Sequence, residues 1–134
     1  MPSKRNWNSN RIDRRAQDIL AAIARIREYI RGVSSAQFLR NNLVYDAVTR
    51  QILIISEACS RIREIEAKLD LEAVALLAVR QPGVPWHAIA GIGNIIRHAY
   101  GDDDPTIIRD AVFGKDLASL ECALLAEFTS VSRE

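Results

Sequence analysis

The chain has 134 residues, which is long enough for one domain whose core needs neither disulfides nor a structural metal. Hydrophobic residues make up 49% of it, and six glycines and four prolines are too few for a disordered or loop-rich protein. The net charge of +1 conceals an asymmetry, because residues 1–50 hold ten lysines and arginines against four acidic residues. Such a basic segment either meets phosphates or is the solvated face of a helix, and charge alone slightly favours the helix face.

Nothing in the sequence predicts a membrane or secreted protein. No apolar run approaches the roughly 20 residues that cross a bilayer. The start, Met1 to Arg5, lacks the apolar segment of a secretory signal. The two cysteines, Cys59 and Cys122, lie in apolar helical contexts and are expected to be reduced and packed in the core. We therefore expect a cytoplasmic protein without a membrane partner.

Apolar residues at steps of three and four predict helices throughout the chain. Residues 1–11 are expected to form a flexible N-terminal arm, and residues 12–134 a single helical domain. In chain order, helices are predicted at about 12–31, 36–39, 42–69, 71–79, 85–98, 104–112 and 116–128, with glycine, serine and proline marking the breaks. These elements predict an all-α fold, an antiparallel bundle of four main helices with one or two short ones.

Most cofactor and metal chemistry is excluded by the residues present. Gly91-Ile92-Gly93 lacks the other residues of a phosphate-binding loop and the strand before it. The chain has two histidines and widely separated cysteines, so a zinc or di-iron site is not expected. The three adjacent carboxylates of Asp102–Asp104 are more typical of a solvated turn than of a binding site for a divalent cation. We therefore predict no metal and no cofactor.

The segment from Asn94 to Tyr100 gathers the groups with most chemical potential. Asn94 and His98 lie one helical turn apart on the same face, Arg97 is adjacent, and Tyr100 follows at the helix end. An imidazole that transfers protons and a guanidinium that stabilises a negative transition state are the minimum for metal-free RNA cleavage. From chemistry alone, however, a single histidine at a helix end more often caps carbonyl groups.

Glu57 is a second candidate. Its neighbours Ile54, Ile55 and Ala58 are apolar, and a carboxylate in such a surface needs a partner. From the sequence alone, Glu57 is equally compatible with a structural ion pair and with a supporting role beside a functional site.

The motifs resemble those of the HepT-type HEPN family. The residues concerned are Pro85-Trp86, Ile89-Ala90-Gly91, Asn94, His98 and Tyr100, together with Asp18-Ile19-Leu20, Phe38-Leu39, Asp46-Ala47-Val48 and Ile55-Ser56-Glu57-Ala58. The family usually has glycine where Ser56 stands. The resemblance implies a helical HEPN bundle that forms a homodimer, with motif residues of both subunits in one cleft. It also implies a metal-independent RNase toxin that is paired with a minimal nucleotidyltransferase antitoxin of the MntA type.

The resemblance assigns roles within the Asn94–Tyr100 segment. His98 corresponds to the catalytic histidine, and Tyr100 corresponds to the tyrosine to which the antitoxin transfers AMP. Asn94 and Arg97 complete the predicted catalytic set, and Glu57 is a possible supporting residue. The family motif has an arginine five positions before the histidine, whereas this chain has Gly93. Either the nuclease is degenerate, or Arg97 lies back over Gly93 and supplies the missing charge.

Three hypotheses follow from the sequence. The first is an RNase toxin that acts as a dimer on RNA. The second is a non-catalytic helical subunit that binds a nucleotidyltransferase or a nucleotide. The third is a structural helical dimer in which His98 is a cap and Tyr100 a packing residue. Gly93 favours the second hypothesis, while His98 and Arg97 favour the first.

Overall fold

The computed structural model describes residues 3–98 and 104–132, with side chains described for residues 11–98 and 104–128. All its elements are helices, which confirms the predicted all-α bundle. In chain order they are α1 (Ser3–Tyr29), α2 (Ser35–Arg40), α3 (Asn42–Lys68), the 3-10 helix η1 (Ala73–Ala75), α4 (Leu77–Arg80), α5 (Trp86–His98), α6 (Pro105–Phe113) and α7 (Asp116–Ser132). Four long helices thus alternate with shorter elements, and the segment predicted as one helix at about 71–79 is divided into η1 and α4.

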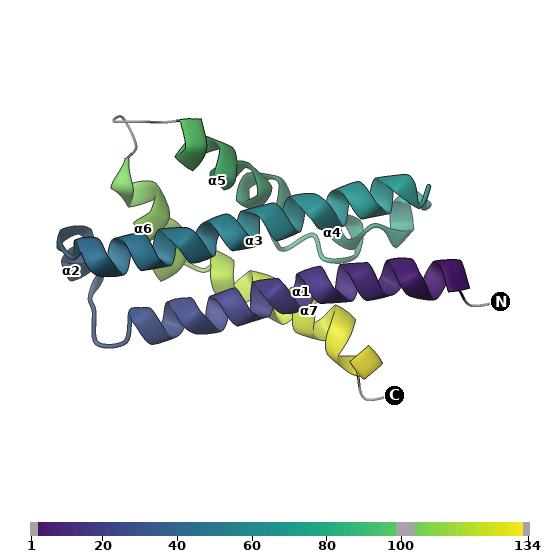
Figure 1. Cartoon of the computed structure of the whole chain (residues 1–134), viewed down its shortest axis with the longest axis horizontal. Coiled ribbons are helices and arrows are strands. Elements are labelled where there is room, and N and C mark those ends of the chain that lie inside the picture. The colour runs from purple at the N-terminus through teal and green to yellow at the C-terminus, as the bar shows by residue number, and fades with distance from the viewer. Residues whose placement is uncertain (1–2, 99–103, 133–134) are drawn as a thin grey trace.

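The antiparallel pair α1 and α3 forms the centre of the fold (Figure 1). Each helix buries one apolar stripe, which includes Ile19, Ile23 and Ile26 on α1 and Ile55 and Ile62 on α3. These side chains recur at steps of three, four and seven, so they line one face of each helix. The burial of both stripes against each other is what holds the two longest helices together.

The chain reverses between α1 and α3 through a short, well-capped connection. Gly32 has a φ of +75°, which a residue with a Cβ rarely adopts, and it ends the first helix. Ser34 and Gln37 then form a capping box, in which the Ser34 Oγ accepts from the Gln37 N–H at 3.1 Å and the Gln37 Oε1 accepts from the Ser34 N–H at 2.9 Å. α2 follows and places Phe38 in the core.

The remaining helices cover the central pair from two sides. α5 packs against α3, and α7 packs against α1 and contributes the fully buried Leu120 and Leu124 (Figure 1). Arg27 on α1 forms an ion pair with Glu121 on α7 at 2.6 Å. α6 contacts α2, where the rings of Phe38 and Phe113 lie 5.5 Å apart. Of the two central helices, α3 is the one on which α5 packs most extensively.

The start of α1 and the exposure of Cys122 differ from what the sequence predicts. α1 begins at Ser3, ahead of the predicted start at Ile12, while the flexibility expected of residues 1–11 stays a prediction. The expectation that both cysteines are packed in the core is wrong for Cys122, whose side chain is exposed on α7, whereas Cys59 is buried on α3. Within the described residues, no helix combines the length and apolar character that crossing a membrane requires.

Candidate active site

The start of α5 is fixed by a buried tryptophan. Trp86 is 8% exposed, and its indole Nε1–H donates to the Gln81 carbonyl oxygen at 2.8 Å. Val84 and Ile89, which flank it in sequence, are also buried in the core. Trp86 is therefore a packing residue that sets where the helix begins, and it is not available for stacking on a base.

The middle of α5 contacts α3 through Ser56 and Gly93. The Ser56 hydroxyl, which is buried, donates to the Ala90 carbonyl oxygen at 2.8 Å and accepts from the Gly93 N–H at 2.9 Å. A Cβ added at Gly93 would lie 2.7 Å from the Ser56 Oγ. A Cβ at position 93 would therefore displace the Ser56 hydroxyl from the position in which it makes both hydrogen bonds.

Arg97 lies back across Gly93. Its two terminal guanidinium nitrogens, Nη1 and Nη2, are each 3.3 Å from the position that a Cβ of Gly93 would take. Nη2 also donates to the Asn94 Oδ1 at 3.1 Å, which holds the side chain along the helix. The guanidinium thus occupies the space beside position 93, one turn before its own Cα.

The Arg97 side chain forms one wall of an open groove between α1, α3 and α5. This groove, which we call the α5 groove, has a volume of about 380 Å³. Its charged lining consists of Arg15 and Asp18 from α1, Arg50 and Glu57 from α3, and Arg97 from α5. Three of these five side chains are cationic, so the groove is suited to a negatively charged group.

Glu57 differs from the expectation of a carboxylate inside an apolar surface. Its side chain is 47% exposed, and its Oε1 accepts from the Arg61 Nε one turn along α3 at 3.0 Å. The carboxylate of Glu57 therefore has the partner that its apolar neighbours led us to expect, and this partner is Arg61, an arginine on the surface of the same helix. Glu57 also lines the groove that contains Arg97, and its role in supporting a site stays a prediction.

His98 is the last residue of α5, and its side chain is exposed. Among the described residues it has no hydrogen-bond partner, so the imidazole is not engaged in capping a described carbonyl group. Asn94, predicted on the same face, is exposed and bonded to Arg97 instead. Tyr100, the predicted AMP acceptor, lies outside the described residues.

No group of three or more histidine, cysteine, aspartate or glutamate side chains with metal-binding geometry occurs in the described part of the chain. Of the Asp102–Asp104 cluster only Asp104 is described, and its carboxylate caps α6 by accepting from the Thr106 N–H at 3.0 Å and from the Thr106 hydroxyl at 2.7 Å. These bonds lower the pKa of Asp104 below its ordinary value. Asp104 is thus used in starting a helix.

Comparison with protein families now identifies the chain. Residues 19–124, from the middle of α1 to α7, match the family described as Ribonuclease HepT-like. The chain belongs to the HepT-like ribonuclease family. The comparison with solved structures gave no match. The HepT-like match includes both sides of the Ser56–Gly93 contact and the whole Asn94–Tyr100 segment, whereas Arg15 and Asp18 of the α5 groove precede it.

Sequence reasoning missed the part that α1 and the first half of α3 play in this site. The charge of residues 1–50 slightly favours a solvated helix face, and it singles out neither Arg15 nor Arg50. Both line the α5 groove opposite Arg97 because α3 packs between the other two helices. The only sequence signal was the excess of basic residues in positions 1–50, which does not identify the individual side chains.

Proposed function

We propose that the protein is a metal-independent RNA endonuclease whose site is formed by His98, Arg97 and Asn94. The 2′-hydroxyl of RNA attacks the adjacent phosphate, so the bond from the 2′-oxygen to phosphorus forms while the bond to the 5′-oxygen breaks. One proton leaves the 2′-hydroxyl and one reaches the departing 5′-oxygen. An imidazole is suited to such transfers near neutral pH, and His98 presents one at the exposed end of α5.

The observation that carries this proposal is the position of the Arg97 guanidinium. In the motif that the sequence resembles, an arginine stands at position 93, where this chain has glycine. The guanidinium of Arg97 lies 3.3 Å from the place of the missing Cβ, and the Asn94 amide holds it there. Arg97 therefore takes over the charge role and stabilises the extra negative charge of the transition state.

The dimer and the antitoxin belong to the same proposal. We infer that two copies associate through the exposed side of α5, where Ile95 is 47% exposed beside the site residues, and that motif residues of both subunits share one cleft. A nucleotidyltransferase of the MntA type then transfers AMP to Tyr100 and silences the nuclease. The added phosphodiester brings a negative charge to the segment beside Arg97, where it competes with the RNA phosphate. We place this pair in the cytoplasm.

The test of catalysis compares the two histidines of α5. Purified wild type is expected to cleave a single-stranded oligoribonucleotide in the presence of EDTA, to leave 2′,3′-cyclic phosphate ends, and to spare a strand with 2′-deoxy linkages. His98→Ala should lose at least about a hundredfold in rate, while His87→Ala, the matched control at the exposed start of α5, should cleave like wild type. Equal rates for the two variants would refute the role of His98.

Inactive wild-type protein would favour the second hypothesis, a HepT-like subunit that binds its nucleotidyltransferase without cleaving RNA. The modification is tested independently by the intact mass of the chain after co-expression with the nucleotidyltransferase. Increments of AMP that disappear in Tyr100→Phe would support the pairing under either hypothesis. An unchanged mass would contradict the proposed modification.

A further inference from the structure

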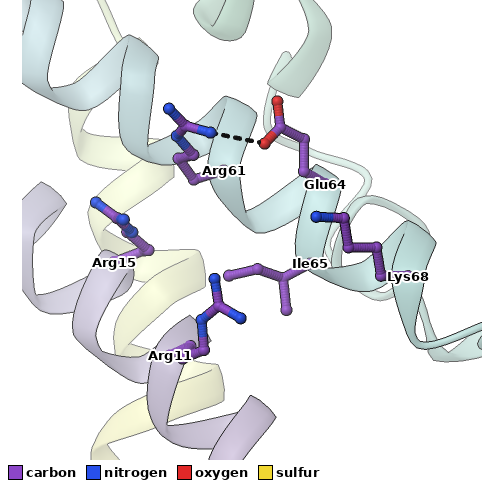
Figure 2. Close-up of a pocket in the computed structure, with 6 residues that line it drawn as sticks. All are labelled: Arg11, Arg15, Arg61, Glu64, Ile65 and Lys68. Atoms are coloured by element: carbon purple, nitrogen blue, oxygen red, sulfur yellow. Dashed lines mark hydrogen bonds and ion pairs between the residues drawn. The ribbon is translucent and has the colours of Figure 1, made fainter.

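A second groove lies along the seam between α1 and α3 (Figure 2). It has a volume of about 120 Å³, and its lining residues are Arg11, Arg15, Arg61, Glu64, Ile65 and Lys68. In Figure 2 the Ile65 side chain extends from α3 towards Arg11 on α1, while Arg61 pairs with Glu64 farther along α3. Ile65 is the apolar residue of the lining, and the other five lining residues are charged. We call this the seam groove.

The seam groove and the α5 groove are adjacent and meet at Arg15, which lines both of them. On α3 the cationic lining residues are Arg50, Arg61 and Lys68, which are eleven and seven positions apart and therefore share one face of the helix. Arg50 and Lys68 are separated by about 27 Å along the helix axis. The two grooves thus form one elongated surface with Arg97 at its side, which we call the basic track.

The basic track is more strongly positive than the protein as a whole. Its lining contains six basic side chains, Arg11, Arg15, Arg50, Arg61, Lys68 and Arg97, against three acidic ones, Asp18, Glu57 and Glu64. The whole chain has a net charge of only +1. Charge is therefore concentrated along this surface and balanced by acidic residues elsewhere.

The acidic side chains do not neutralise the track evenly. Arg61 alone engages both Glu57 and Glu64, at 3.0 Å each. Arg15, Arg50 and Lys68 form no ion pair with any other described residue. These three cations are spread over the length of the track, so they are suited to a ligand that carries several separated negative charges.

We propose that the basic track binds the sugar–phosphate backbone of single-stranded RNA and leads it to Arg97. This inference rests on the proposed function, which it deepens by naming the path of the substrate. The lining contains no aromatic side chain on which a base would stack, so binding is electrostatic and independent of sequence. A strand of regularly spaced phosphates matches the elongated row of cations better than a compact anion.

The test uses the full-length wild-type protein and a labelled single strand of about twelve nucleotides, whose 2′-O-methyl groups prevent cleavage. Fluorescence anisotropy gives Kd at several salt concentrations. The variant Arg15→Gln/Lys68→Gln removes two cations of the track. The matched control is Arg25→Gln/Lys115→Gln, which removes one arginine of α1 and one lysine, both exposed and outside the track.

The track variant is expected to bind about tenfold more weakly at about 0.1 M salt. The slope of log K against log salt concentration should also become shallower by about 1.4, since each phosphate contact of a single strand contributes about 0.7. The control should change Kd less than twofold. Equal Kd values for the two double variants would overturn the inference, and so would a wild-type protein that binds no oligonucleotide.

The same experiment separates this inference from the proposed function. Suppose that the wild type binds RNA without cleaving it and that the track variant binds more weakly. This result would refute the nuclease activity and leave the basic track supported. Wild type that cleaves, with the track variant binding and cleaving like the control, would refute the track alone. If the track binds an acidic protein and not RNA, the wild type will not bind the oligonucleotide, and this result would overturn the inference.

Discussion

At Gly93, the absence of a side chain determines two features of the site. It lets the Ser56 hydroxyl bridge the backbone of α5, and it leaves the space in which the Arg97 guanidinium lies. The two features are coupled because a Cβ at this position meets the Ser56 Oγ at 2.7 Å and Arg97 at 3.3 Å. Serine at 56, glycine at 93 and arginine at 97 therefore act as one unit, and a change at one position is expected to depend on the others.

A double-mutant cycle at positions 56 and 93 tests this coupling. Gly93→Ala in the wild type should reduce the free energy of unfolding by about 1–2 kcal/mol, since the Ser56 hydroxyl loses its two hydrogen bonds when it moves aside. In the Ser56→Ala background the same change should be neutral or stabilising by up to about 1 kcal/mol, because alanine has the higher helix propensity.

Denaturant unfolding of the four proteins measures both values. The expected result is a reversal of sign between the two backgrounds. Additive effects would contradict the close contact of Ser56 with position 93.

The short elements after α3 are held to the rest of the molecule by polar contacts. Buried Glu66 of α3 accepts from the Leu77 N–H at the start of α4, at 2.8 Å, and burial raises the pKa of this carboxyl. Glu127 of α7 accepts from the Arg80 Nε and the Gln81 amide, at 2.8 Å each. Because the Gln81 carbonyl oxygen also accepts from the Trp86 indole, this network connects α7 to the start of α5, the helix of the candidate site.

The network predicts a pH dependence of stability. Burial raises the pKa of Glu127, but the bonds from Arg80 and Gln81 outweigh it, so the pKa lies below the ordinary value. A carboxyl with a lowered folded-state pKa contributes stability above its unfolded pKa and loses it as the pH falls through the folded value. Glu127→Gln should therefore lower stability by about 1 kcal/mol at neutral pH, and by less below about pH 4.

Thermal unfolding of both proteins across this pH range measures the difference. The gap between the two Tm values should narrow as the pH falls. A gap that stays constant would show that ionised Glu127 does not stabilise the fold.

The sequence predicted the helices well because each apolar stripe is a local property. The periodic isoleucines of α1 and α3, and the proline before α5, mark elements that the structure contains. The sequence could not predict the contact between Ser56 and Gly93, because these residues are 37 positions apart and meet only when α5 packs on α3. The composition of the basic track depends likewise on α1 and α3 lying antiparallel.

At the scale of the whole molecule, the reactivity of the two cysteine thiols measures how well the core of the bundle is packed. Burial raises the pKa of the Cys59 thiol to about 12, whereas the Cys122 side chain is exposed on α7. The thiolate of a cysteine attacks the disulfide of Ellman's reagent and releases its aromatic thiolate, so the reaction requires a thiol that is both ionisable and accessible to the reagent. We expect one fast-reacting thiol in the native protein and a second only in denaturant, with Cys122→Ser removing the fast one. Two fast thiols in the native state would contradict the packed core around α3.

In the proposed mechanism Arg97, lying over Gly93, supplies the charge of the arginine that the HepT-type motif has at position 93. The most direct measurement compares RNA cleavage by wild type, by Arg97→Ala, and by the triple variant Arg97→Ala/Ser56→Gly/Gly93→Arg, each first shown to be folded by thermal unfolding. Arg97→Ala should lose about 10²- to 10³-fold in rate. The triple variant should recover much of it, because removing the Ser56 hydroxyl makes room for the new side chain. An Arg97→Ala protein as active as wild type, or a folded triple variant as inactive as the single one, would contradict the claim.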